Sequence, residues 1–264
     1  MRKKAAGSLA ATMFAALVTV TWVVDAAAVT PIASCGDLAK AGETYVLTRN
    51  LSASGDCLTV KNDRVTIDFK TYSITGDGST GAAVTDGGVA RAVTVVKNGT
   101  VESFETGIDL AASDRGDVRS MSVRFNAGDG IALGTRGLVK TCVVEHNGGY
   151  GVVVGDFGQV QDCFINLNGN DGIHAGSHSL ITRNFCQSNQ GSGIVTGPFG
   201  TVTYNQSGTN AEDGIWVGAN SQVNGNTVGD NWGYGIEFVC PGQIANNDVW
   251  GNNPNYPSCA GNDK

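Results

Sequence analysis

The sequence predicts an all-β solenoid, a parallel β-helix of about nine to ten stacked coils. Asparagine recurs every 21 residues, and a glycine followed by a β-branched residue recurs in step. A fixed period of about 20–25 residues is typical of solenoids, and one this short leaves no room for paired helices. The asparagines are Asn126, Asn147, Asn168, Asn189, Asn210, Asn231 and Asn252. The glycine pairs are Gly130-Ile131, Gly151-Val152, Gly172-Ile173, Gly193-Ile194, Gly214-Ile215 and Gly235-Ile236.

The regular coils extend over residues 117–253, and each is expected to contain three short strands. Apolar residues alternate with polar ones around three positions of the repeat, which is a strand pattern. These positions begin with Val118, Val123 and Ile131, and later coils keep apolar or small residues there. One coil cannot bury such side chains alone, so each coil must be stabilised by its neighbours.

The periodic asparagines are expected to turn inward and to hydrogen-bond to one another along the solenoid axis. A second asparagine row starts only halfway along, at a position where earlier coils have Met121, Cys142 and Cys163. This abrupt change predicts that the turn changes shape there. The second row contains Asn184, Asn205, Asn226 and Asn247.

The earlier part of the chain is less regular, although residues 98–110 resemble a coil with a slightly longer loop. Residues 29–57 are predicted to form an N-terminal cap and first strand, with a short helix over residues 36–41. A cap is expected because the end of a solenoid must shield its open core. Residues 29–264 then form a single domain.

The first 28 residues resemble a signal peptide. Three basic residues precede a mostly apolar run, and Ala26-Ala27-Ala28 supplies a small-residue cleavage site. The alternatives are an uncleaved membrane anchor and a lipoprotein, since residues 32–35 resemble a lipidation motif ending in Cys35. Cleavage predicts a secreted, periplasmic or cell-surface protein without stable membrane insertion.

The charge distribution excludes several partners. Without residues 1–28 the chain loses three of 17 basic residues and one of 24 acidic residues, leaving a net charge of about −9. No Lys or Arg occurs between Asn184 and Asp263. Such a surface repels nucleic acid, which needs basic patches, and it should repel acidic polysaccharides unless a cation bridges them. The oligomeric state is left open.

Seven cysteines in an exported chain suggest disulfides. Cys35 and Cys57 flank the N-terminal segment, and Cys240 and Cys259 flank the C-terminal one, so each pair is predicted to close one end. The other three are expected in the core as small apolar residues, with their pairing left open. These are Cys142, Cys163 and Cys186. No metal-type cysteine spacing is present.

A binding site should lie among the outward residues, which vary while the inward ones repeat. Two outward positions flank the glycine pairs and should form one stripe along the solenoid, because coils are about 4.8 Å apart. The candidate ligand-binding residues on this stripe are Asp171, His174, Asp213, Trp216, Tyr234 and Glu237, with Trp232 at a nearby turn.

Three interpretations of the stripe compete. Aromatic and carboxylate side chains together suit sugar binding. Alternatively Asp171, His174 and Asp213 are catalytic candidates, since two acids two coils apart approach the spacing of an inverting glycosidase. The third interpretation is that an aspartate before glycine simply suits a tight, solvated turn. No cofactor is predicted, although the Asp-Gly steps leave calcium open.

The asparagine and glycine pattern over about residues 95–253 resembles the right-handed parallel β-helix repeat family of exported bacterial proteins. The resemblance implies the fold but not a reaction, because the family includes pectate lyases, polygalacturonases, alginate epimerases and non-catalytic surface proteins. The catalytic patterns of those enzymes are absent, including the Asp-Pro-His-Asp motif of the epimerases. Six coils also lack any inserted loop that would build a cleft.

The sequence therefore favours an exported protein that binds or scaffolds polysaccharide without catalysis. The alternatives are a carbohydrate-active enzyme, namely a lyase, hydrolase or epimerase, and a purely structural or adhesive surface protein.

Overall fold

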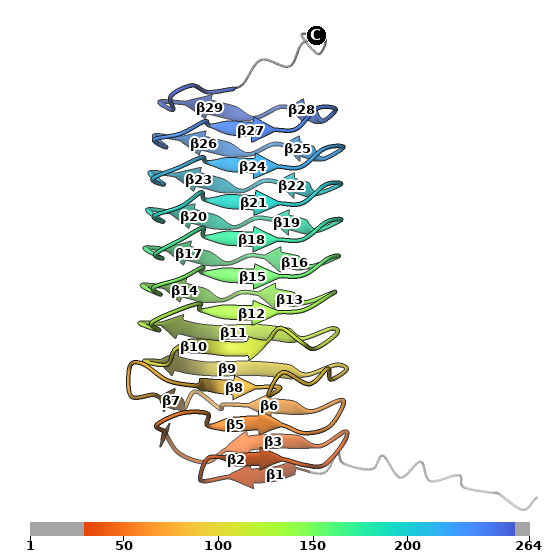
Figure 1. The fold of residues 1–264 in the computed structure, drawn as a ribbon, viewed down its shortest axis with the longest axis vertical. Helices are drawn as coiled ribbons and strands as arrows, with labels where there is room; N and C mark the ends of the chain where they lie inside the picture. Colours follow the sequence, from red (N-terminus) through yellow and green to blue (C-terminus); the bar gives the residue numbers. More distant parts are fainter. Residues whose placement is uncertain (1–28, 257–264) are drawn as a thin grey trace, which may run out of the picture.

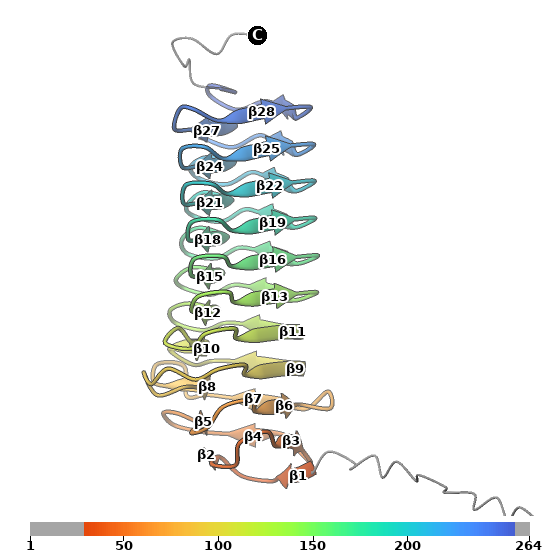
Figure 2. The ribbon, with the colours of Figure 1, turned by 90° about the vertical axis from the view of Figure 1, so that its right-hand side faces the viewer.

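The computed structural model describes residues 29–256, which wind into an all-β parallel solenoid (Figures 1 and 2). Its coils stack along the long axis of the molecule, with the first coil at one end and the last at the other (Figure 1). In the described residues the strands of successive coils pair in parallel, as the predicted fold requires.

Two sheets run the length of the solenoid. A ten-stranded sheet, here called sheet B, has one strand in each coil. Its strands are β2 (Gly36–Leu38), β5 (Leu58–Val60), β8 (Ala82–Thr85), β10 (Thr106–Leu110), β12 (Ile131–Leu133), β15 (Val152–Val154), β18 (Ile173–Ala175), β21 (Ile194–Thr196), β24 (Ile215–Val217) and β27 (Ile236–Phe238).

The larger sheet has 19 strands and bends between two columns, which the long strands β9 (Val95–Glu102) and β11 (Asp117–Arg124) join. In the regular coils the first column contains β13 (Leu138–Lys140), β16 (Gln159–Gln161), β19 (Leu180–Thr182), β22 (Thr201–Thr203), β25 (Gln222–Asn224) and β28 (Gln243–Ala245). The second column contains β14 (Val143–Glu145), β17 (Phe164–Asn166), β20 (Phe185–Gln187), β23 (Gln206–Gly208), β26 (Thr227–Gly229) and β29 (Asp248–Trp250). The earlier strands are β1 (Val29–Ile32), β3 (Thr44–Leu47), β4 (Leu51–Ser52), β6 (Thr66–Asp68) and β7 (Ser73–Thr75).

The core is a column of stacked apolar side chains. The middle residue of each first-column and second-column strand points inward, and both end residues of most sheet B strands do so. Val139, Val144 and Val152, one from each strand of a coil, are all 0% exposed. The predicted three-strand coil and its inward positions are therefore confirmed.

The asparagine ladder is confirmed as a continuous hydrogen-bonded column. Asn147 Nδ2 donates to Asn168 Oδ1 at 3.0 Å and to the Val123 carbonyl at 3.2 Å, and Asn147 N–H donates to the same Asn168 oxygen at 3.2 Å. This arrangement repeats from coil to coil, so the buried amides are satisfied.

The second asparagine row forms a similar ladder, but the expected change in turn shape is wrong. The φ angles of Thr141, Asp162, Arg183 and Tyr204, which precede the row in successive coils, lie between 55° and 58°. The turn keeps its shape because a cysteine replaces asparagine in the same role: the Cys142 N–H donates to Cys163 Sγ at 3.4 Å. The Cys163 sulfur thus accepts the kind of backbone hydrogen bond that an asparagine oxygen accepts in later coils. Cys142, Cys163 and also Cys186 are free and buried.

The N-terminal segment differs from the prediction. Residues 36–38 form strand β2 instead of a helix, and β2 pairs with β5 in sheet B. Leu38 is buried inside the coil, so this segment completes a first coil of the solenoid and contributes to its core.

The predicted Cys35–Cys57 disulfide is present, with its Cα atoms 4.6 Å apart. The sulfur of Cys35 is therefore bonded to Cys57, which contradicts lipidation at this residue. The predicted signal peptide and Cys259, the expected partner of Cys240, lie outside the described residues. Among residues 29–256 no helix has the length and apolarity needed to cross a membrane.

Candidate functional site on sheet B

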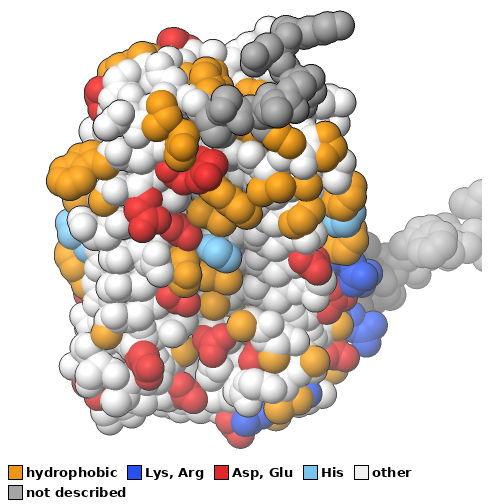
Figure 3. Space-filling model, turned by 45° about the horizontal axis from the view of Figure 1, so that its top comes forward, with side chains coloured by type: hydrophobic (Ala, Val, Ile, Leu, Met, Phe, Trp, Pro, Cys, Tyr) orange, Lys and Arg blue, Asp and Glu red, His pale blue; other side chains and the backbone are white. Residues whose placement is uncertain are grey.

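The outward face of sheet B brings the candidate residues into one stripe, as the sequence predicted. His174 in β18 is in register with Val195 in β21, which is followed by Trp216 in β24 and Glu237 in β27. Figure 3 shows acidic side chains close to a histidine and to apolar side chains on one face of the molecule. A linear row of this kind suits an extended polymer lying parallel to the solenoid axis.

The aspartates that precede the glycine pairs have a structural role. Asp129 Oδ1 accepts the Tyr150 N–H at 2.8 Å, and Asp213 Oδ1 accepts the Tyr234 N–H at 2.7 Å. In both cases the carboxylate binds the backbone of the next coil. Asp171 does the same for Ser192 at 2.8 Å. These aspartates therefore link coils together, in addition to any role toward a ligand.

Asp171 has a second partner that Asp129 lacks. Its Oδ2 lies 3.1 Å from His174 Nδ1, while its side chain is only 10% exposed against 45% for the histidine. The Tyr150 ring contacts the same imidazole with the centroids 5.0 Å apart. A buried carboxylate thus orients an accessible imidazole beside a phenol, which are three groups suited to proton transfer.

A second pair of acids lies further along the stripe. Burial, together with the hydrogen bond and negative charge of Asp213, raises the pKa of Glu237 to about 7. Two nearby carboxyl groups resist ionising together, so this pair retains a proton near neutral pH. Glu237 is in register with Trp216, whose indole lies on the neighbouring strand.

One geometric relation connects both groups. Tyr150 contacts His174, and Asp213 contacts Glu237, and in each case the second residue lies 24 positions after the first. A side chain at the turn before sheet B therefore reaches the outward strand residue of the following coil. The predicted site did not include Tyr150. Its position 21 residues before Asp171 places it in the same outward column, which could have identified it from the sequence.

Other predicted residues are placed differently. Asp171 and Asp213 are both linked to Ser192: Asp171 Oδ1 accepts the Ser192 N–H at 2.8 Å, and the Asp213 N–H donates to Ser192 Oγ at 3.3 Å. Trp232 is 79% exposed at its turn. In the described part of the chain, no three His, Cys, Asp or Glu side chains come together in a way that could hold a metal ion.

The fold and this stripe define a parallel β-helix with a polar outward face. A family model described as the right handed beta helix region matches residues 42–184, which is more than half of the chain. The chain therefore belongs to the right-handed β-helix family, as the sequence resemblance implied. The sequence matches no curated protein significantly.

Solved structures of similar fold include polysaccharide-modifying enzymes. The A-module of the mannuronan C-5 epimerase AlgE4 of Azotobacter vinelandii has a TM-score of 0.58 at 12% identity, with 88% of each chain covered. The AlgE6 A-module from the same organism has a TM-score of 0.52 at 14% identity, covering 86% of this chain and 76% of that one. A periplasmic alginate epimerase, AlgG, in a double-mutant form has a TM-score of 0.51 at 14% identity, covering 84% and 67%. At such identities the likeness concerns the fold.

Proposed function

We propose that this protein is a polysaccharide-active enzyme whose proton-transfer centre is Tyr150, Asp171 and His174. The observation that carries the proposal is the contact of an accessible imidazole with both a buried carboxylate and a phenol. This departs from the non-catalytic binding that the sequence favoured and adopts its enzymatic alternative. The Cys35–Cys57 disulfide supports a location outside the cytoplasm, where such polymers occur.

The side chains suggest distinct roles. With Nδ1 held by Asp171, the His174 Nε2 atom is the one left to exchange a proton with a ligand. The Tyr150 phenol is the second group that can donate or accept one. Because the two ring centroids are 5.0 Å apart, no sugar ring fits between them, so we expect both groups to approach a bound sugar from the same side.

This same-face geometry favours β-elimination over inversion at a carbon. In an elimination on a uronate, the C-5–H bond breaks and its proton passes to one of the two groups. The C-4–O bond breaks while the leaving oxygen takes a proton from the other group, and a C-4=C-5 double bond forms. The three similar structures are named as C-5 or alginate epimerases, and epimerisation also begins with removal of a C-5 proton.

The acidic surroundings constrain the substrate. Asp129, Asp171, Asp213 and Glu237 share this face, so an anionic polymer would bind better with calcium or with Glu237 protonated. We therefore expect activity on uronate polymers to increase with added calcium and to weaken as pH rises above the Glu237 pKa of about 7.

The test is a screen of the purified protein against alginate, pectate and neutral glycans, with and without calcium. Ultraviolet absorbance detects elimination, deuterium uptake from solvent detects epimerisation, and reducing sugar detects hydrolysis. His174→Asn and Tyr150→Phe should each abolish the detected activity. His178→Asn is the matched control, because His178 lies at another turn between Phe157 and Phe199. Activity that survives His174→Asn would refute this assignment of the site.

Binding without chemistry is the second candidate. It is favoured by the uninterrupted coils, which leave the sheet B face without inserted loops to exclude water. Calcium-dependent binding of a polymer that remains chemically unchanged in all three assays would support this candidate over the enzyme.

A further inference from the structure

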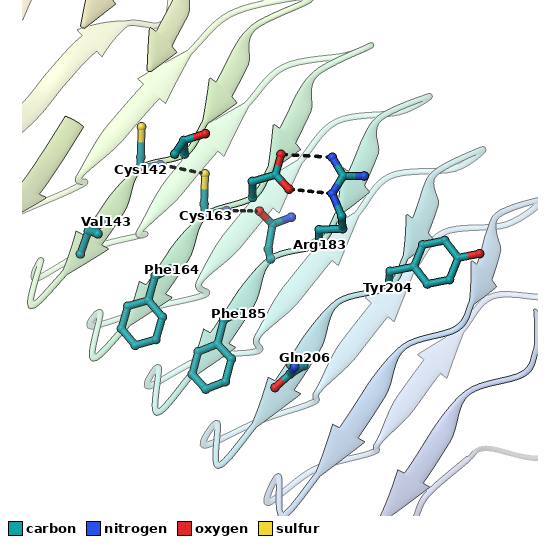
Figure 4. Close-up of a pocket in the computed structure, with 11 residues that line it drawn as sticks. Cys142, Val143, Cys163, Phe164, Arg183, Phe185, Tyr204 and Gln206 are labelled. Atoms are coloured by element: carbon teal, nitrogen blue, oxygen red, sulfur yellow. Dashed lines mark hydrogen bonds and ion pairs between the residues drawn. The ribbon is translucent and has the colours of Figure 1, made fainter. Parts of the chain in front are cut away.

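A long hollow lies on another side of the solenoid, at the bend between the two columns of the larger sheet. One part, of about 520 Å³, is lined by residues from Thr141 to Gln206 (Figure 4). A second part, of about 500 Å³, is lined by residues from Thr71 to Val143. Both parts include Thr141 and Val143, so they form one groove that runs along the axis. We call it the bend groove.

The two walls of the bend groove differ in chemistry. On one wall, Phe164 and Phe185 stack with ring centroids 4.9 Å apart and an angle of 8° between the rings (Figure 4). The opposite wall contains Arg183, which donates to both carboxylate oxygens of Asp162 at 2.6 and 3.1 Å. This ion pair lowers the pKa of Asp162 and leaves the wall polar without net charge.

An exposed aromatic side chain stands at the C-terminal end of the groove. Tyr204 is 64% exposed, and its φ of 58° is the turn conformation that Thr141, Asp162 and Arg183 adopt at the same position of earlier coils. The next coil has Gly225 at this position, and a Cβ there would lie 2.8 Å from Tyr204 Cε1. Gly225 thus leaves room for the Tyr204 ring at the end of the groove.

We infer that the bend groove binds a neutral pyranose chain, at a site separate from sheet B. Sugar rings present C–H faces that pack on aromatic rings and hydroxyl groups that bind charged and amide side chains. The phenyl wall, the Asp162–Arg183 pair and Gln206 supply these two kinds of contact. The absence of net charge in the ion pair favours a neutral polymer over an anionic one. The inference does not require the proposed activity.

The experiment measures binding of β-1,4-linked glucose and mannose hexasaccharides, and of a mannuronate hexasaccharide, by calorimetry. Tyr204→Asn is the first variant, because asparagine tolerates the same backbone conformation and should preserve the fold. Phe199→Asn is the matched control, since Phe199 is 51% exposed at another turn with a φ of 61°. Phe185→Ala tests the opposite wall.

We expect one neutral hexasaccharide to bind and to lose at least about tenfold in affinity in Tyr204→Asn and in Phe185→Ala. Binding should be unchanged in Phe199→Asn and in His174→Asn, which separates this groove from the proposed active site. The inference is overturned if no neutral hexasaccharide binds, if only the mannuronate probe binds, or if Phe199→Asn weakens binding as much as Tyr204→Asn.

Discussion

The buried asparagine ladder and the outward face of sheet B follow the same 21-residue period but use it in opposite ways. In the ladder the residue is the same in each coil from Asn126 to Asn252, because each amide must match the one above and below it. On sheet B the outward residue changes from Val153 to His174, Val195, Trp216 and Glu237. A residue type that repeats in every coil therefore indicates a structural role, while an outward position whose residue type varies is where a site can form.

Removing one amide from the ladder should have the largest effect. In Asn168→Ala, two donors of Asn147 and the Val144 carbonyl lose their buried partner. We expect a loss of about 3 kcal/mol in the free energy of unfolding, measured by urea denaturation. The outward Asn224→Ala should change it by less than about 0.5 kcal/mol. Equal effects of the two variants would contradict a structural role specific to the ladder.

Asp171 and Asp129 offer a matched pair on the sheet B side. Both accept a backbone N–H of the next coil, but only Asp171 also contacts His174. We expect Asp171→Asn to lower the activity found in the polysaccharide screen at least about tenfold, because an amide holds the imidazole less well in its active form. Asp129→Asn should retain most of that activity. If both variants lose it equally, the aspartates serve only to join coils.

The Glu237 carboxyl should make stability depend on pH. The unfolded chain releases this proton near pH 4.5 and the folded protein near pH 7, so folding is favoured at low pH and loses stability as pH rises between these values. Glu237→Gln removes this penalty. We expect it to raise the melting temperature by a few degrees at about pH 8 and to raise it less at about pH 5, by scanning calorimetry. A pH-independent difference would argue against the Asp213–Glu237 contact.

Adding one more asparagine to the second row should have the smallest effect on the free energy of unfolding. Cys163 already accepts the Cys142 N–H at the place that asparagine takes in later coils, and the backbone there is the same. Cys163→Asn should therefore be tolerated and should stabilise the protein by about 0.5–1 kcal/mol, as measured by urea denaturation. Destabilisation by more than about 2 kcal/mol would show that the sulfur fills space that an amide cannot.

The fold was predictable from the sequence because its determinants are local and repeated. The inward valines and isoleucines, the ladder asparagines and the Cys35–Cys57 pair all follow from spacing alone. The N-terminal coil was misjudged because Gly36–Leu38 lies outside the period, and its strand is defined only by pairing with Leu58–Val60. The constant turn at Cys142 and Cys163 is hidden in the sequence because cysteine and asparagine differ in residue type, although the Cys163 sulfur and the Asn184 amide oxygen each accept the corresponding backbone N–H of the preceding coil.

The sequence by itself determined which residues face outward on sheet B, since a period of 21 residues returns each position to the same side of the coil. Only the tertiary structure decided which of them touch. The turn side chains reach across to the following coil, so Tyr150 meets His174 and Asp213 meets Glu237. The 21-residue period gives the column that a residue occupies. The coil toward which its side chain points depends on the backbone conformation at the turn. For that reason the stripe and the candidates Asp171 and His174 were foreseen, and the contact of Tyr150 with His174 was not.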